Sequence, residues 1–120
     1  MLPAGHRLRR GADISTVVRR GRRATSSGAR LLVVHARAAD AADRLPRAGF
    51  VVGRSVGGSV VRHRVIRRLR HLVRPHLATL PSGTDLVVRA LPGAATASYD
   101  ELDRALEGAL RRATAPGRRP

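Results

Sequence analysis

One segment of this chain, residues 60–77, separates its apolar and basic side chains onto opposite sides of a predicted helix. At about 100° per residue, the apolar residues fall on one half of the helical wheel. They are Val61, Val65, Ile66, Leu69, Leu72 and Val73. The other half carries His63, Arg64, Arg67, Arg68, Arg70, His71 and Arg74, and only Arg62 lies among the apolar positions. Such a helix buries one face, so the chain must supply a second layer for it to pack on.

The rest of the chain offers short strands and two further helices for that layer. We expect the central helix from about Val60 to Arg74, capped by Ser59 and ended by Pro75 or soon after. Other expected elements are a helix at 14–20 capped by Asp13 and closed by Gly21, a loop or edge strand at 22–28, strands at 31–34, 48–52 and 85–90, and a helix at 99–112 capped by Ser98 or Thr96. The runs at 31–34 and 48–52 are candidates for a hairpin with a long connection. This order predicts a single α+β sandwich.

Composition restricts the partner more than the fold. The chain has 120 residues and a formal charge of +16, and all 24 of its lysine-plus-arginine residues are arginine. We expect one domain over residues 1–112 and a basic disordered tail over 113–120. With no cysteine, no long apolar span and no apolar stretch after the basic start, we expect a cytoplasmic protein without disulfides, signal peptide or membrane anchor.

The basic face of the central helix indicates a polyanionic partner. Like charges one turn apart destabilise a helix by a few tenths of a kcal/mol per pair, so an ordinary solvated face mixes signs. Here no acidic residue occurs between Phe50 and Gly83. A membrane-surface helix would leave its apolar face free for lipid, whereas so small a domain needs Val61, Val65 and Leu69 in its core. The sequence therefore favours RNA or DNA.

No catalytic centre is recognisable in the protein itself. Gly53 and Gly58 have the spacing of a phosphate-binding loop, but Ser59 stands where its lysine should be. Glycines before a helix still suit a backbone phosphate, and Arg54 beside them adds charge. The five histidines form no metal-like cluster with carboxylates, and we expect no metal site. No nucleophile elbow or paired carboxylate site occurs either.

Several segments together resemble one known family. The run 62–70, Arg-His-Arg-Val-Ile-Arg-Arg-Leu-Arg, resembles the arginine-rich signature of the bacterial ribonuclease P protein subunit. The preceding run 54–60 is similar to that family's glycine-containing lead-in. Arg7-Leu8, the residues from Asp13 to Gly21, the run 85–90 and the run 99–102 follow in the family's order and spacing. The resemblance covers roughly residues 7–112.

The resemblance implies both a fold and a role. The fold is an αβββαβα sandwich like the second domain of ribosomal protein S5, with the arginine-rich helix crossing over a small mixed sheet. In this family a catalytic RNA cleaves precursor tRNA with Mg²⁺ held by RNA and substrate, and the protein binds that RNA and the 5′ leader, broadening substrate specificity. No membrane and no obligate protein partner is implied.

The resemblance also assigns residues. The implied RNA contacts are Arg54, Arg62, His63, Arg64, Arg67, Arg68, Arg70 and Arg74. The implied leader cleft is lined by Ile14, Val18 and Val34. Ile14 and Val18 stand where the family has aromatic residues, and Ile66 stands where it has a lysine. Two other interpretations stay open: a general RNA-binding protein such as a ribosomal protein, and a stand-alone metal-dependent nuclease, against which the lack of clustered carboxylates argues.

Overall fold

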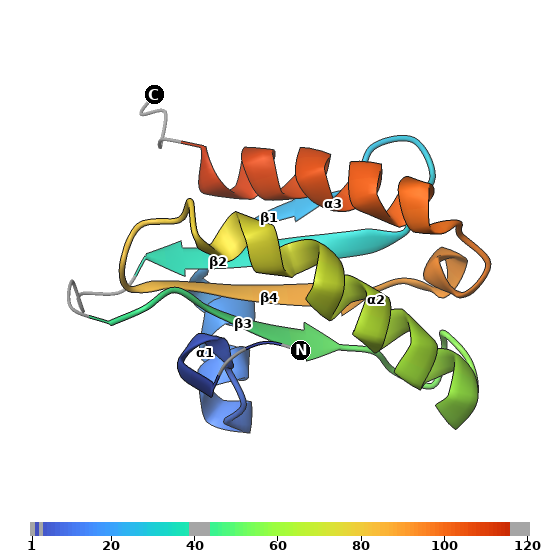
Figure 1. Ribbon diagram of the computed structural model, residues 1–120, viewed down its shortest axis with the longest axis horizontal. Helices are drawn as coiled ribbons and strands as arrows, with labels where there is room; N and C mark the ends of the chain where they lie inside the picture. Colours follow the sequence, from blue (N-terminus) through green and yellow to red (C-terminus); the bar gives the residue numbers. More distant parts are fainter. Residues whose placement is uncertain (1, 3, 39–43, 116–120) are drawn as a thin grey trace.

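A computed structural model describes residues 2, 4–38 and 44–115 as helices packed on a four-stranded sheet. The helices are α1 (Gly11–Arg20), α2 (Ser59–Leu77) and α3 (Tyr99–Thr114), with short 3-10 turns at Ala4–His6 and Pro92–Ala95. The strands are β1 (Arg22–Thr25), β2 (Leu32–Ala38), β3 (Arg47–Val51) and β4 (Thr84–Ala90). Helices α2 and α3 lie together on one face of the sheet, and α1 lies on the other (Figure 1). The expected α+β sandwich is confirmed.

The strands lie in the order β1-β2-β4-β3. β2 pairs antiparallel with both β1 and β4, whereas β3 pairs in parallel with β4. The hairpin considered for the runs at 31–34 and 48–52 is therefore wrong, because β4 lies between β2 and β3. Parallel neighbours need a long crossover connection, and here α2 makes the crossover from β3 to β4.

Strand alternation divides the sheet residues between two cores. Val34, Leu86 and Val88 are fully buried in the main cluster, beneath α2 and α3. On the opposite face, Val87 packs with Leu8 and with Val17 of α1. Because successive side chains of a strand point to opposite faces, neighbouring valines in the same strand serve different cores.

The helix ends agree with the sequence only in part. Ser98 caps α3 as predicted, with Glu101 completing a reciprocal capping box. By contrast, α1 begins before Asp13 and α2 begins at Ser59, so neither residue is a cap; the N-cap positions belong to Arg10 and Gly58, and neither makes a side-chain cap bond.

Two helices also run past their expected ends. α2 includes Pro75 and continues to Leu77. α3 continues to Thr114, and Ala113, which was assigned to the tail, is buried in the core. Ala115 follows as the C-cap of α3, and residues 116–120 of the expected tail lie outside the described residues.

A buried carboxylate joins the β3 side of the sheet to β4. Asp85 is 6% exposed and accepts hydrogen bonds from Arg47 and Arg44, the closest at 3.0 Å and 2.8 Å. Burial alone raises the pKa of Asp85, but the hydrogen bonds and charges of the two guanidinium groups outweigh it and hold the pKa below its usual value. The ionised form is therefore the one that stabilises the folded sheet.

Asp85→Asn should lower the free energy of unfolding at neutral pH by about 1.5–3 kcal/mol, the usual contribution of hydrogen bonds to a charged group. Because the folded pKa is below the unfolded one, the advantage of the wild type is complete above about pH 3.9 and disappears as pH falls through the folded pKa. Urea denaturation of the wild type and of Asp85→Asn at a series of decreasing pH values measures this difference in the free energy of unfolding. A stability difference that did not shrink in acid would contradict the role of the carboxylate.

Candidate nucleic-acid interface

Helix α2 has the two faces that its sequence predicts. Val65, Leu69, Leu72, Val73 and Leu77 are buried against the sheet and α3. Ser59 and Val60 at the start of the helix are exposed, and beyond them the exposed positions are His63, Arg67, Arg70, His71, Arg74 and Pro75. Arg67, Arg70 and Arg74 recur at three- and four-residue spacing, so their guanidinium groups follow one another along the helix. We refer to these three arginines as the arginine row.

Two other arginines of α2 have contacts within the protein. Arg64 Nη2 donates to the carbonyl oxygen of Ala95 at 2.9 Å, and Arg68 Nη1 donates to that of Ala97 at 3.4 Å. Both are only half-exposed. They connect α2 to the segment that leads into α3, and this role was not evident from the sequence. Replacing either one would disturb packing as well as surface charge.

Arg62 and Ile66 occupy the borders between the two faces. The Nε atom of Arg62 is buried without a hydrogen-bond partner among the described residues. Ile66 was expected in the apolar half, yet it is half-exposed and outside both core clusters. Together with His63, Arg67 and Arg70 it lines a hollow of about 440 Å³ on the outer side of α2. The apolar stripe of α2 is therefore narrower than the helical wheel suggested.

Arg54 lies in the turn before α2. It is exposed, and the turn is closed by a hydrogen bond from Val56 N to Gly53 O at 3.1 Å. The helix then begins after Gly58. The structure thus places Arg54 near the amino end of α2, at a distance along the helix from the arginine row.

The three residues predicted to line one cleft do not share a face. Ile14 and Val18 lie on α1, half-buried against the small cluster of Leu8, Val17 and Val87. Val34 is fully buried in the main core on the opposite face of the sheet. Val34 therefore cannot line one cleft together with Ile14 and Val18, and that part of the prediction is wrong; its neighbours in β2 point toward the α1 side because strand side chains alternate.

One of those neighbours, His35, has an unusual environment. It is only 3% exposed, and neither ring nitrogen has a hydrogen-bond partner among the described residues. Arg23 lies directly across from it in β1, and Arg89 lies one diagonal step away in β4. Burial first, and then the charges of Arg23 and Arg89, lower the pKa of His35. The sequence did not single out His35, Arg23 and Arg89, because it does not show which of the two alternating sets of strand side chains faces α1.

Acid should destabilise the protein through His35. The pKa of His35 is lower in the folded than in the unfolded state. As pH falls from about 6.5 toward the folded pKa, only the unfolded state takes up the proton, so the free energy of unfolding decreases. In His35→Phe this loss should be absent, so the variant should gain stability relative to wild type between about pH 7 and about pH 5. Urea denaturation of wild type and variant at these two pH values tests the prediction. The four other histidines are present in both proteins, so their titration does not contribute to the difference. Parallel pH profiles would contradict the prediction.

Comparisons with known proteins agree with the sequence motifs. The family model described as Ribonuclease P matches residues 2–114. A ribonuclease P protein component from Streptomyces griseus is 54% identical over 126 aligned positions, covering 99% of this chain and all of that protein. The protein component from Rhodococcus opacus is 53% identical, covering 93% of this chain and 91% of its own length.

This chain belongs to the ribonuclease P protein component family. As such it is part of a ribonucleoprotein endoribonuclease of tRNA processing and works with an RNA subunit. Solved ribonuclease P proteins share its fold. The one from Staphylococcus aureus gives a TM-score of 0.76 at 24% identity over 90% of this chain and 94% of that chain. The one from Thermotoga maritima gives 0.73 at 24% identity over 88% and 96%.

The described part of this ribonuclease P component contains no group of three or more histidine and acidic residues close enough to hold a metal ion. Within the same residues, no helix combines the length and the apolar character needed to cross a membrane. The features that remain as candidates for function are the basic outer face of α2 and the basic strand residues on the α1 side of the sheet.

Proposed function

We propose that this protein binds the catalytic RNA of ribonuclease P through the outer face of α2 and holds the 5′ leader of precursor tRNA on the α1 face of the sheet. The observation that carries the proposal is the arginine row, which lies on the exposed face of a helix whose opposite face is buried in the core. Guanidinium groups donate bidentately to phosphate, and because the planar group is pre-organised, little side-chain conformational entropy is lost for each hydrogen bond formed.

The charge around the arginine row supports an RNA partner. Among the described residues, the ion pairs are those of Asp85 with Arg44 and Arg47, both on the other side of the sheet. The guanidinium groups of the row are thus available to phosphate. His63 can donate beside them, and Arg54 adds charge at the amino end of α2. Arg62, Arg64 and Arg68 complete the implied contact set, although the last two also serve the fold.

The α1 face supports a role in holding the leader. Ile14 and Val18 offer apolar contact, and Arg23 and Arg89 flank buried His35 on the adjoining strands. The described residues of this face that carry negative charge are Asp13, which is half-buried in α1, and Asp85, which is already paired. Without the aromatic residues of the family, this face would hold a leader mainly through phosphates and apolar contact.

The chemistry of cleavage would belong to the RNA. In this proposal Mg²⁺ is held by phosphates of the catalytic RNA and substrate, and the protein supplies no metal ligand. Its guanidinium groups replace counterions between two polyanions. The protein should therefore lower the Mg²⁺ concentration that its RNA needs.

The test is cleavage of a 5′-extended tRNA by the cognate catalytic RNA at low Mg²⁺, with and without this protein. We expect cleavage at the mature 5′ end to be stimulated, with no cleavage by protein alone. Stimulation that vanishes at high Mg²⁺ would identify counterion replacement as the cause. Tight RNA binding without stimulation would instead indicate a general RNA-binding domain, and cleavage by protein alone would indicate a catalytic centre in the chain.

A further inference from the structure

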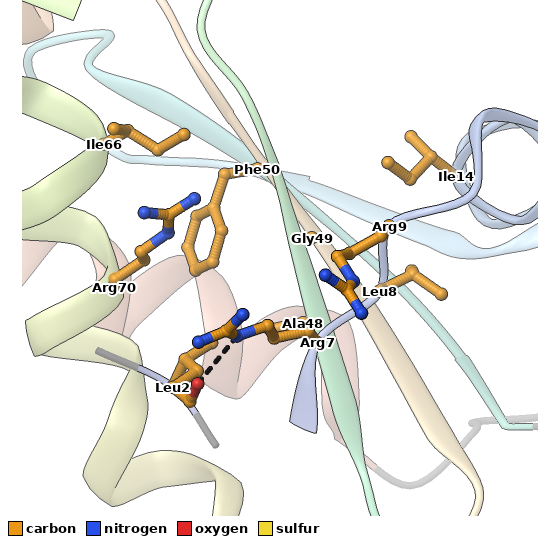
Figure 2. Close-up of a pocket in the computed structure, with 10 residues that line it drawn as sticks. All are labelled: Leu2, Arg7, Leu8, Arg9, Ile14, Ala48, Gly49, Phe50, Ile66 and Arg70. Atoms are coloured by element: carbon orange, nitrogen blue, oxygen red, sulfur yellow. Dashed lines mark hydrogen bonds between the residues drawn. The ribbon is translucent and has the colours of Figure 1, made fainter. Parts of the chain in front are cut away.

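A cavity of about 360 Å³ opens at the outer edge of β3. Figure 2 shows it with Ile66 and Arg70 of α2 on one side of the strand and Ile14 of α1 on the other. Helices α1 and α2 lie on opposite faces of the sheet (Figure 1). The cavity is therefore a place where the two proposed RNA surfaces approach each other around an edge of the sheet.

The segment that precedes α1 is fixed along this edge. Leu8 N donates to Ala48 O at 2.9 Å, and His6 Nδ1 donates to Pro46 O at 2.7 Å. Gly49 permits this approach, because a Cβ atom there would lie 2.7 Å from Leu8 O. The positions on either side of Leu8, Arg7 and Arg9, are consequently held at the cavity.

Three guanidinium groups line the cavity, from Arg7, Arg9 and Arg70. Arg7 Nε donates to Leu2 O at 2.8 Å, which orients its guanidinium group. Arg9 and Arg70 are exposed. Among the described residues, no carboxylate lines the cavity and none of the three arginines forms an ion pair. Such a site attracts an anion, and guanidinium groups match the geometry of a phosphate.

The floor of the cavity is apolar. Phe50, the only phenylalanine of the chain, is half-buried and lines the cavity beside Arg70, with Ile66 next to it (Figure 2). An aromatic ring next to guanidinium groups is the combination that single-stranded nucleic-acid sites use, since the ring takes the base and the cations take the backbone. The volume lies within the ~300–1,000 Å³ of ordinary ligand pockets.

We propose that this cavity binds one nucleotide of single-stranded RNA, with the base on Phe50 and Ile66 and the phosphate between Arg7, Arg9 and Arg70. The strand would pass around the β3 edge, from the α2 surface to the α1 surface. This inference rests on the proposed function and adds a specific subsite to it. The nucleotide comes either from the substrate leader or from the catalytic RNA, and the two sources are separable by experiment.

The test compares Arg9→Ala with Arg10→Ala in the assembled ribonucleoprotein. Both residues are exposed arginines next to each other, but only Arg9 lines the cavity. Affinity is measured for the catalytic RNA and for precursor tRNAs whose leaders grow one nucleotide at a time. We expect Arg9→Ala to weaken one of these affinities about 10-fold more than Arg10→Ala does.

The dependence on leader length identifies the source. An excess loss that appears only beyond a threshold length assigns the nucleotide to the leader. An excess loss in catalytic-RNA affinity that is the same at every leader length assigns it to the catalytic RNA. Equal effects of both variants in both assays would overturn the proposal. If the wild-type protein gave no protein-dependent binding in either assay, the proposed function itself would fail.

A second variant tests the aromatic ring directly. Phe50→Leu keeps an apolar side chain at the half-buried position and should lower the same affinity about 5-fold or more, because the stacking surface is lost. With 2-aminopurine placed successively along the RNA identified above, one position should be quenched by the wild type and not by Phe50→Leu. Identical fluorescence profiles for the two proteins would exclude a base on Phe50 and overturn the proposal.

Discussion

Replacing Arg67, Arg70 and Arg74 together with alanine should weaken binding of the catalytic RNA by about 100- to 500-fold at about 0.1 M salt. Each arginine that neutralises a phosphate contributes about 0.7–0.9 to the slope of log K against log salt concentration, so three contribute between about 2 and 2.7. The same variant should flatten that slope by this amount, and Arg67→Ala alone by about one counterion. Filter binding across a salt series measures both quantities.

A charge-matched control separates location from net charge. Arg30, Arg104 and Arg111 are exposed and outside α2, and their side chains make no hydrogen bond within the described part of the protein. Their joint replacement by alanine removes the same net charge from other surfaces. We expect this control to retain most of its affinity. Equal losses in both triple variants would mean that overall charge, and not the arginine row, drives binding.

Leu69→Ala should destabilise the fold by about 2–5 kcal/mol, because it leaves a cavity where a fully buried side chain was. Leu69 lies in the main core between α2 and the sheet. The loss should appear as a lower denaturation midpoint in urea. RNA binding by the fraction that stays folded should keep the wild-type salt slope, since no guanidinium group has been removed.

Val60→Ala is the matched control on the same helix. Val60 is 80% exposed, so its truncation should change stability by about 0.5 kcal/mol or less. Leu69→Ala and the arginine-row variant should therefore fail in different assays. Equal unfolding by both would contradict the division of α2 into a buried and a binding face.

The helices were largely predictable from local pattern. The stripe of α2 and the capping box of α3 depend on residues a few positions apart, and a helix brings such residues together whatever the rest of the chain does. Prediction failed at helix starts, where Asp13 and Ser59 have capping chemistry but not capping positions. The helical periodicity was clear from the sequence. The first residue of each helix, in contrast, depended on where the preceding chain left the sheet.

The candidate site was predictable only on α2. The arginine row is recognisable because one helical face lacks acidic residues and the other is apolar. By contrast, the protein contacts of Arg64 and Arg68 join residues about thirty positions apart. The cavity at the β3 edge likewise combines the start of the chain with β3 and α2. Spacing in the sequence carries no signal for such contacts.

The sequence by itself determined a basic, cysteine-free chain with one two-faced helix, and motifs in the order of the ribonuclease P protein family. These properties follow from side-chain chemistry and helical periodicity. Tertiary structure alone decided that β4 lies between β2 and β3, and that α1 covers the face bearing His35 while Val34 points into the main core. The physical reason is that both faces of a strand can be apolar, so alternation identifies two faces but not which helix covers each one.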